Sequence, residues 1–474
     1  RDSLRIQAIN IGDREKRLAW LAENLPDGNR AGIVYCLTID DVQRVTDWLP
    51  KHGYNVKSYH GGLDTEKRQE REQMLLNNNV DALVATNALG MGFDKPDLKY
   101  VIHFQRPQNL IRYYQEIGRA GRDLDTAHAI VLSGSDDDEI AEYFIDSSFP
   151  NAGNFEGVLQ TIEAAEEPIS VWDLRTESDA SQVNRCVQML EVDGAIEKTD
   201  AGYVRTANQW EYDGGKFQRI TEQRYTELQR IQEFMDTDRC LTLFIDEQLD
   251  GQMTEPCGRC ANCTDDFYPR FVEDDALIEE AIHHYQDSGI HEINNRVYRY
   301  LEDGSQEKMP PEHRFETGRS LSVYDEPGWG TAVRKGKYDT GKFESSLVDG
   351  AVNLIQNKWE PSPQPEWITY VPSTSNKGLI ADYANRLGAE LGIDVVDCVE
   401  KVRETKPQKE LSGSAETCAN VRNAFEISDA VRPTPVLLID DIVSSRWTLT
   451  EVGRQLLMAG SGSVYPFALA KRRG

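Results

Sequence analysis

Two arginines near the end of a long motif have the spacing of a phosphate-binding pair. Arg119 and Arg122 stand three positions apart within QEIGRAGRD, which overlaps a Tyr-Tyr-Gln-Glu run. A guanidinium group is permanently charged, and its planar fork of N–H donors matches the oxygens of a phosphate. Such a pair can stabilise the charge that develops on the terminal phosphoryl group of a nucleotide during transfer. The alternative is a surface helix held by salt bridges.

Four of the eight cysteines are grouped as metal ligands often are. Cys257, Cys260 and Cys263 have C-x-x-C-x-x-C spacing, and sixteen residues separate Cys240 from them. Four thiolates this close can surround one tetrahedral zinc ion in a structural site with no open position for catalysis. Disulfides and an iron–sulfur cluster are the alternatives. Disulfides suit a secreted chain, and no signal-peptide pattern opens this one.

A pair of carboxylates follows a strongly apolar run near the end of the chain. Asp440 and Asp441 come after the predicted buried strand Val436 to Ile439 and before a loop from Ile442 to Thr448. Paired carboxylates can accept hydrogen bonds from the two hydroxyls of a ribose, while N–H groups at a helix amino terminus hold its 5′-phosphate. The candidate ribose-phosphate residues are therefore Asp440, Asp441, Ser444, Ser445 and Thr448. The alternative is that the two carboxylates only cap a strand end.

The elements that position these residues follow from the hydrophobic pattern. The stretch ALVATNALGMGFD, from Ala82, predicts a buried strand and then a loop in which Gly90 and Gly92 allow close backbone approach. The acidic run at 136–139 is expected to cap a helix, where carboxylates suit the helix dipole. From Ile368 onward, predicted helices and strands alternate, with VVDCVEKV read as one strand. This order is typical of a parallel α/β sheet, which binds ligands at the carboxyl ends of its strands.

A segment between the arginine and cysteine motifs has its own pattern. Residues 154–206 predict an amphipathic helix, a short strand, a turn at 200–202 and a returning strand. This is the pattern of a winged helix, and its candidate DNA contacts are Asn184, Arg185, Lys198 and Arg205. A helical packing module that touches no nucleic acid is the competing interpretation.

Composition limits the classes of function. A chain of 474 residues is expected to hold about three domains. No apolar run reaches the ~20 residues of a membrane span. A net charge of −28 argues against indiscriminate binding to nucleic acid, because a phosphate backbone attracts a basic surface. A DNA-handling protein can still concentrate its Lys and Arg residues in one groove.

Residues of about 30–135 resemble the second motor domain of RecQ-type superfamily-two DNA helicases. GIVYCLT, YHGGL, ALVATNALGMGFD and QEIGRAGRD occur in the order of that family's motifs. The resemblance implies that Arg122, with Arg119, completes an ATP site that Asp94 and Gln115 adjoin or couple to DNA. It implies contacts to the backbone of single-stranded DNA from Thr38, His60, Thr86 and Asn87. The cysteine spacing also matches the zinc module of RecQ helicases, which favours zinc.

The sequence contains no G-x-x-x-x-G-K-[ST] loop, which a complete helicase motor needs to hold phosphate and magnesium. Residue 1 is Arg, and the first residues read as an interdomain linker. We therefore expect the carboxyl-terminal part of a longer helicase, which does not hydrolyse ATP without its first motor lobe.

The last domain resembles type I phosphoribosyltransferases, and ComF-like members in particular. LLIDDIVSSRWTLT and KPQKELSGSAETCANVRNAF carry the likeness. Phosphoribosyltransferases usually have a small, glycine-containing pair where this chain has Arg446-Trp447, and two large side chains there could block the phosphate loop. Catalytic transfer is in doubt on this ground, and a nucleotide-sensing or docking role is the alternative.

Together the two resemblances are those of RecQ-like helicases of the RqlH type. They imply an α/β multidomain protein with four parts: a RecA-like parallel-sheet domain with an amino-terminal linker (1–150), a winged-helix-like domain (151–215), a helical zinc-binding module (216–268) and a phosphoribosyltransferase-like α/β domain (269–474). The implied cofactors are Zn²⁺, ATP with Mg²⁺ in the full-length protein, and phosphoribosyl pyrophosphate or a nucleotide.

The implied activity is 3′-to-5′ DNA unwinding in repair or recombination, on junctions of single-stranded and duplex DNA in the bacterial cytoplasm and nucleoid. A phosphoribosyltransferase targeted by a motor remnant is the second hypothesis. A non-catalytic interaction protein is the third.

Overall fold

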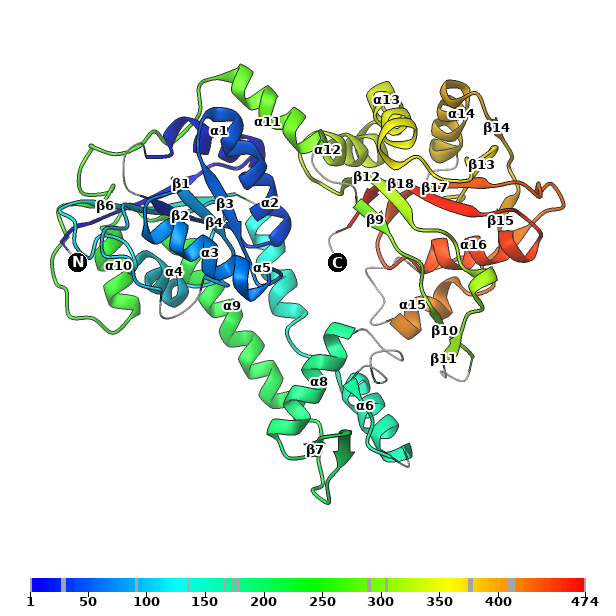
Figure 1. The fold of residues 1–474 in the computed structure, drawn as a ribbon, viewed down its shortest axis with the longest axis horizontal. Helices are drawn as coiled ribbons and strands as arrows, with labels where there is room; N and C mark the ends of the chain where they lie inside the picture. Colours follow the sequence, from blue (N-terminus) through cyan, green and yellow to red (C-terminus); the bar gives the residue numbers. More distant parts are fainter. Residues whose placement is uncertain are drawn as a thin grey trace. The chain divides into compact units, whose positions relative to one another are not determined.

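The computed structural model describes residues 2–26, 31–89, 93–134, 136–165, 167–171, 174, 180–287, 291–302, 306–373, 378–406 and 414–472. These form two compact units, Arg1–His284 and Tyr285–Gly474 (Figure 1). Each unit has its own six-stranded sheet and its own hydrophobic core. Within the described ranges, no helix is both long and apolar enough to cross a membrane.

The first unit is built on a fully parallel sheet with the strand order β1-β6-β5-β2-β4-β3. The central strands are four residues long and buried throughout, as expected for a parallel sheet covered on both faces. The strands are β1 (Leu4–Asn10), β2 (Gly32–Tyr35), β3 (Val56–Tyr59), β4 (Ala82–Ala85), β5 (Tyr100–His103) and β6 (Ala127–Ser133).

The helices of this unit alternate with the strands and then continue as a helical region. They are α1 (Arg14–Asn24), α2 (Ile39–Trp48), η1 (Leu49–His52), α3 (Thr65–Leu76), α4 (Leu110–Ile117), α5 (Asp136–Asp146), α6 (Ala152–Ala164), α8 (Ala180–Val192), α9 (Gly214–Asp236), α10 (Leu241–Gln248) and α11 (Asp275–Asp287), the last of which reaches into the second unit. Residues of α9 and α10 share one hydrophobic core with the sheet and with α4. The helical region therefore packs directly on the predicted motor domain.

The amino terminus of α5 carries the acidic run, and the prediction of a helix there is confirmed. The carboxylates are also paired from outside the helix. The fully buried Arg17 of α1 donates to Asp137 at 2.8 Å and also contacts Asp136. Arg106, which follows β5, contacts Asp138. The start of α5 is thus tied to α1 and to the end of β5.

A small module is inserted between α5 and α9, which pack against each other. It contains α6, α8 and an antiparallel hairpin of β7 (Ile196–Thr199) and β8 (Gly202–Arg205). The pattern predicted α8 and the hairpin but not α6. Val183, Val187, Leu190 and Ile196 are buried in a separate core that also takes Phe217 from the start of α9. The module is therefore a distinct body carried on a helical stalk. Its classification as a winged helix stays a prediction.

The second unit has a mixed sheet with the order β14-β13-β17-β18-β12-β9, in which only β9 is antiparallel to its neighbour. Its strands are β9 (His291–Ile293), β12 (Gly318–Val323), β13 (Trp367–Tyr370), β14 (Asp394–Val395), β17 (Val436–Val443) and β18 (Val464–Lys471). Two antiparallel pairs of strands accompany it, β10 (Tyr298–Tyr300) with β11 (Gln306–Lys308) and β15 (Val399–Lys401) with β16 (Phe425–Ile427). The predicted strand VVDCVEKV is therefore wrong in part, because β14 and β15 divide it between two sheets.

The helices of the second unit are α12 (Trp329–Arg334), α13 (Ser345–Asn353), α14 (Leu379–Leu391), α15 (Ser414–Val421) and α16 (Trp447–Met458), with short turns η2 (Pro311–His313), η3 (Lys335–Thr340) and η4 (Leu354–Trp359). β13 leads through α14 to β14 on one side, and β17 leads through α16 to β18 on the other. β13 and β17 are adjacent and parallel, and the chain continues from them toward opposite edges of the sheet. In parallel α/β sheets, such a switch point is where ligands bind.

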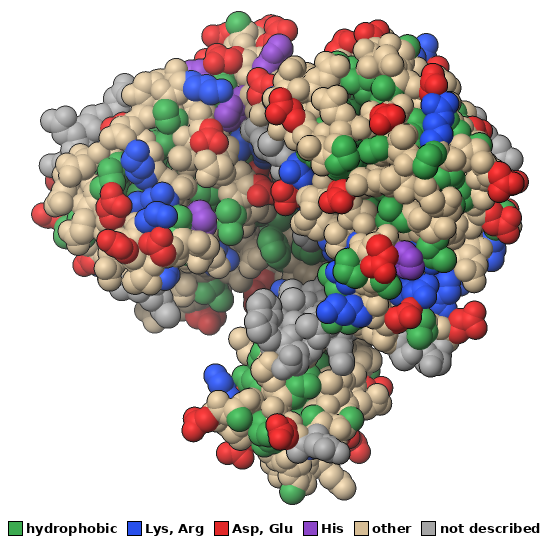
Figure 2. Space-filling view, turned by 45° about the vertical axis from the view of Figure 1, so that its right-hand side comes forward, with side chains coloured by type: hydrophobic (Ala, Val, Ile, Leu, Met, Phe, Trp, Pro, Cys, Tyr) green, Lys and Arg blue, Asp and Glu red, His purple; other side chains and the backbone are tan. Residues whose placement is uncertain are grey.

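The visible surface of both units carries acidic side chains throughout, with Lys and Arg in small groups among them (Figure 2). This distribution accords with the net charge of −28. The face that Figure 2 shows therefore has no broad basic field of the kind that attracts a phosphate backbone.

Candidate nucleotide, nucleic-acid and metal sites

The two arginines follow α4 in a tight turn. Asn109 caps the start of this helix by accepting the N–H of Arg112 at 2.9 Å. Gly121 has a φ of +68°, and a Cβ there would lie 2.8 Å from the Cβ of Ala127. Both the backbone conformation and the space therefore require glycine at this point of the turn.

Both guanidinium groups are anchored to the same short segment. Arg119 is half-buried and donates from Nη1 to the carbonyl of Phe93 at 3.2 Å. Arg122 is exposed, with its Nη1 2.7 Å from Oδ1 of Asp94. The side chain of Asp94 is 54% exposed. Arg122 thus lies at the surface, held by a carboxylate that an arriving phosphate can replace.

Gln115 and the glycines of the preceding loop complete the predicted nucleotide residues. Gln115 is exposed on α4. Gly90 and Gly92 lie outside the described residues.

A buried hydrogen-bonded pair that was not predicted from the sequence, His103 with Glu116, links α4 to the sheet. His103, at the end of β5, is bonded through Nε2 to Oε2 of Glu116 at 2.8 Å, and Arg112 donates to Oε1 at 3.0 Å. Burial alone raises the pKa of Glu116, but the His103 bond and the Arg112 charge outweigh it and hold the pKa below its ordinary value. The ring of Tyr35 stacks on His103 with centroids 5.3 Å apart. The signal in the sequence was a Glu on the apolar face of α4, three positions before Arg119.

The four predicted DNA contacts of the motor domain lie along one edge of the sheet. Thr38 follows β2, His60 follows β3, and Thr86 and Asn87 follow β4. These strands are parallel and adjacent in the order β2-β4-β3, so their carboxyl ends form a row. The structure therefore brings the four residues to one edge.

Hydrogen bonds of Thr38 and Thr86 and a lowered pKa of His60 characterise three of these residues. Thr38 is the N-cap of α2, and its hydroxyl donates to Oδ2 of Asp41 at 2.7 Å. Burial and the nearby Arg71 lower the pKa of His60, which favours the neutral form of its imidazole. The hydroxyl of Thr86 accepts the N–H of Ala88 at 3.4 Å. Asn87 is exposed.

The predicted contacts of the inserted module are engaged in holding it together. Arg185 donates to the backbone carbonyl of Ser147 at the end of α5. Arg205 bonds to Glu163 at 2.9 Å and to the carbonyl of Asn208 at 3.0 Å. Asn184 is half-buried and Lys198 is exposed. The two arginines have structural partners here, and their contact with DNA stays a prediction.

The four grouped cysteines converge on one point. Their sulfur atoms all lie within 4.8 Å of one another, and Cys260 is 3.9 Å from Cys240 and 3.5 Å from Cys263. Four sulfurs at ~2.3 Å from a tetrahedral zinc would be about 3.8 Å apart, so the group fits a single ion. An iron–sulfur cluster has several irons with separate thiolate ligands and needs a wider cage.

Backbone N–H groups point at these sulfurs as they do at metal-bound thiolates. The N–H of Leu241 approaches Cys260 at 3.3 Å, and the N–H of Cys257 approaches Cys240 at 3.2 Å. Burial raises the pKa of the Cys257 thiol, but hydrogen bonds from Thr242 and from the backbone of Arg259 lower it to about 6. All eight cysteines fall within the described ranges, and none of them forms a disulfide. The donor set suits zinc, with Cys240 brought in at the start of α10.

The carboxylate pair of the second unit lies within β17 rather than after it. The strand continues to Val443, and α16 begins at Trp447, so the loop between them is only 444–446. Asp441 is buried and lies 2.8 Å from Nζ of Lys337 in η3. Burial and the neighbouring Asp441 raise the pKa of Asp440 to about 7. The two carboxylates therefore do more than cap the end of a strand, because Lys337 from η3 forms an ion pair with Asp441.

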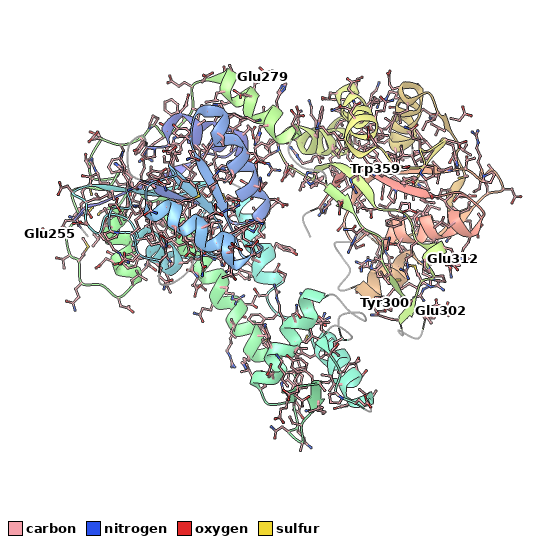
Figure 3. All side chains as sticks on the ribbon, in the orientation of Figure 1. Glu255, Glu279, Tyr300, Glu302, Glu312 and Trp359 are labelled. Carbon is pink, nitrogen blue, oxygen red and sulfur yellow. The ribbon has the colours of Figure 1, made fainter. Side chains whose placement is uncertain are left out.

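The loop residues show why a large pair is tolerated there. Ser444 is exposed, Ser445 and Thr448 are half-buried, and Arg446 has a φ of +66°. Trp447 turns into the core and packs 5.9 Å from the ring of Tyr300, which is labelled on β10 in Figure 3. The expected blockage by two large side chains therefore does not involve Trp447.

Comparison with known proteins identifies part of the chain. Residues 16–123 match the helicase conserved C-terminal domain. The chain is 29% identical over 264 residues to ATP-dependent DNA helicase RecQ of Synechocystis, in a match that covers 53% of this chain and 52% of the relative. It is 36% identical over 174 residues to the probable ATP-dependent DNA helicase RecS of Bacillus subtilis, covering 35% and 33%.

Among solved structures, a DEAD box protein from Methanococcus jannaschii is 25% identical, with a TM-score of 0.27 and coverage of 30% of this chain and 39% of that one. Residues 16–123 therefore match a helicase C-terminal domain and contain most of the parallel sheet, and the chain is similar to RecQ helicases. It spans about half the length of the first relative and a third of the second.

Proposed function

We propose that this chain forms the second motor lobe and zinc module of an ATP-dependent 3′-to-5′ DNA helicase acting in DNA repair or recombination. The single observation that carries the proposal is the surface position of Arg122, which forms an ion pair with the exposed Asp94. A second lobe needs such an arginine to reach a triphosphate held by another lobe. The RecQ relatives support the assignment to a DNA-dependent enzyme.

In this proposal the residues have separate roles. Arg119 and Arg122 stabilise the transferring phosphoryl group. Asp94 and Gln115 link that site to the edge of the sheet that carries the predicted DNA contacts. ATP and Mg²⁺ are bound mainly by a first motor lobe that carries the phosphate-binding loop missing from this sequence. Closure of the two lobes on ATP and their reopening move single-stranded DNA along the row formed by Thr38, His60 and Thr86 with Asn87.

The direct test uses the full-length protein and a duplex with a single-stranded tail. We expect unwinding that requires ATP and a 3′ tail, and ATP hydrolysis that single-stranded DNA stimulates. A 5′-tailed duplex of the same sequence is the control. Hydrolysis that DNA does not stimulate, together with no unwinding of either substrate, would contradict the proposal.

We propose further that the four cysteines bind one structural zinc ion. Cys240 and Cys260 lie in the core shared with the motor sheet, and the N–H of Ala261 donates to the carbonyl of Ile6 in β1 at 2.9 Å. Loss of the metal is therefore expected to loosen β1 as well as the cysteine loop. Metal analysis should give about one zinc per chain, and Cys263→Ser should lower both the zinc content and the unfolding midpoint. A stable protein purified without metal would contradict this role.

We propose a second function for the other unit, because carboxylates, a lysine and hydroxyl groups lie together at the switch point between β13 and β17. Asp440, Asp441 and Lys337 gather there, next to the loop of Ser444 and Ser445 and the first turn of α16, which contains Thr448. This set suits a ribose 5-phosphate group, as in phosphoribosyl pyrophosphate or a nucleotide, with the carboxylates accepting from ribose hydroxyls. If a base binds beside the ligand as an acceptor, the site transfers the phosphoribosyl group to it. Without an acceptor, the site only senses the ligand.

Calorimetric titration of the chain with phosphoribosyl pyrophosphate and Mg²⁺ tests this site. We expect binding that Asp441→Asn abolishes and that the control Asp429→Asn, a change of an exposed carboxylate, leaves intact. Release of pyrophosphate on addition of a base would distinguish transfer from sensing. No binding of either phosphoribosyl pyrophosphate or nucleoside monophosphates would remove the proposal.

A further inference from the structure

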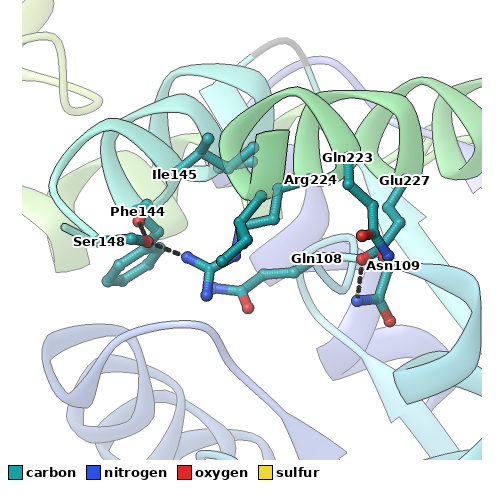
Figure 4. Close-up of a pocket in the computed structure, with 10 residues that line it drawn as sticks. Gln108, Asn109, Phe144, Ile145, Ser148, Gln223, Arg224 and Glu227 are labelled. Carbon is teal, nitrogen blue, oxygen red and sulfur yellow. Dashed lines mark hydrogen bonds between the residues drawn. The ribbon is translucent and has the colours of Figure 1, made fainter. Parts of the chain in front are cut away.

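A pocket of about 380 Å³ opens beside the row of predicted DNA contacts, on the motor unit. Its volume is near the lower end of the range for ligand sites. Two stalk helices, α5 and α9, and the loop before α4 form its walls (Figure 4). None of the roles described above uses this pocket.

The pocket has an apolar side and a polar side. Apolar side chains line the α5 and α9 walls, namely Ala141, Phe144, Ile145 and Ile220. Three carboxamides, those of Gln108, Asn109 and Gln223, also line it, together with the guanidinium of Arg224 (Figure 4). The pocket therefore offers an apolar contact together with groups that both donate and accept hydrogen bonds.

Existing bonds fix the shape of this pocket before any ligand arrives. Arg224 contacts the hydroxyl of Ser148, and its guanidinium lies 4.9 Å from the ring centroid of Phe149. Glu227 accepts from Asn109 at 2.9 Å and from Gln223 at 3.1 Å. The one carboxylate in the lining is thus already satisfied, and it disfavours a polyanion at that end. The ligand that fits best has a neutral, planar part with hydrogen-bonding edges and a separate anionic group near Arg224.

The position of the pocket indicates which of these ligands it binds. Gln108 and Asn109 follow β5, which lies next to β2 in the sheet, so their loop extends the row that follows β3, β4 and β2. Neighbouring strands are ~4.8 Å apart, so the row from β3 to β5 is about 14 Å long. A single strand of DNA laid along the row would bring its next nucleotide to the pocket, at the foot of the stalk that carries the inserted module.

We propose that this pocket holds an unstacked base of single-stranded DNA. Its apolar wall packs on the face of the base, Gln108 and Gln223 bond to its edge, and Arg224 lies near the adjoining phosphate. Carboxamides pair with base edges through a donor and an acceptor together, and apolar or aromatic packing of a base is tolerant of sequence. The inference rests on the proposed DNA-binding function, and it places the inserted module directly beyond a held nucleotide.

The test measures the affinity of the 474-residue chain for two fluorescent strands of equal length. One strand has bases, and the other is an abasic deoxyribose-phosphate chain. The pocket variant is Gln108→Ala with Gln223→Ala. The control is Gln218→Ala with Gln229→Ala, because these two lie on α9, as Gln223 does, but outside the pocket, and bond to Glu222 and Glu233 at 2.9 and 3.1 Å.

We expect the pocket variant to bind the base-bearing strand about tenfold more weakly than the wild type, from the loss of two base-edge contacts. Its affinity for the abasic strand should be unchanged, and the control variant should match the wild type on both strands. Equal loss on the two strands, or no loss on either, would overturn the assignment.

The variant Asn87→Ala separates failure of the pocket from failure of the motor assignment. If Asn87→Ala weakens binding and the pocket variant does not, the pocket proposal fails and the DNA-binding function stands. If the wild-type chain binds neither strand, both fail together. Gln223 is exposed and Gln108 half-buried, so both variants are expected to keep the unfolding midpoint of the wild type, which the same samples report.

Discussion

Replacing Arg122 by Ala separates a catalytic arginine from a stabilising one. The Arg122–Asp94 pair has a 2.7 Å contact, but its side chains are 39% and 54% exposed. A pair this exposed contributes at most ~1 kcal/mol to stability, because water screens both charges. An arginine that stabilises phosphoryl transfer contributes ~10³–10⁵-fold to the rate, or about 4–7 kcal/mol of barrier. The loss of activity should therefore far exceed the loss of stability.

The assay is DNA-stimulated ATP hydrolysis by the full-length protein, measured beside urea unfolding. Arg230→Ala is the matched control, since Arg230 and Glu233 form a 2.7 Å pair with exposures of 50% and 39% on α9. We expect Arg122→Ala to hydrolyse ATP at least a thousandfold more slowly while still binding it, and the control to keep full activity. A fall in rate below tenfold, or an equal fall in both variants, would refute the reasoning.

Three further predictions concern stability. The raised pKa of Asp440, about 7, means that the folded state binds a proton more tightly than the unfolded chain, so the second unit should lose stability as pH rises from ~4 to about 7. Asp440→Asn should flatten this dependence in thermal unfolding at pH 5 and pH 8, and a wild-type midpoint that did not fall would contradict it. Arg17→Met leaves Asp137 buried without its charged partner and should cost about 3–5 kcal/mol in urea unfolding, and a cost below about 1 kcal/mol would show that the pair is dispensable. Gly121→Ala meets both a positive φ and the Cβ of Ala127, so it should cost about 1–3 kcal/mol, whereas Gly157→Ala in an open helix position should not destabilise; similar values for both would count against the strain.

The sequence predicted the elements whose residues have a strong period or a fixed spacing. The buried strands around Ala82 and Val436, the hairpin after α8 and the convergence of the four cysteines all have local causes. The strand ends were less predictable. β17 was expected to stop at Ile439 but continues to Val443, because its neighbour β18 supplies partners as far as Lys471. That pairing is set by the sheet and not by the residues of β17.

The partners of charged residues were also beyond the sequence. Nothing near Asp441 predicts that Lys337, more than one hundred positions away, reaches it across the switch point. The contact of His103 with Glu116 has the same origin, since β5 and α4 meet only in the folded sheet. Arg185 and Arg205 were predicted from charge to face DNA, but the fold provides them with carbonyl and carboxylate partners. Charge type is visible in a sequence, whereas a partner distant along the chain is not.

The central claim is that Arg122 leaves Asp94 to meet a phosphate held by another lobe. A structure of the full-length protein with ADP, Mg²⁺ and aluminium fluoride as a mimic of the transferring phosphoryl group measures this directly. The account predicts a guanidinium-to-fluoride contact at ~2.7–2.9 Å, the length of a charge-assisted hydrogen bond, with the Asp94 pair broken. Arg122 still paired with Asp94 and remote from the mimic would contradict it.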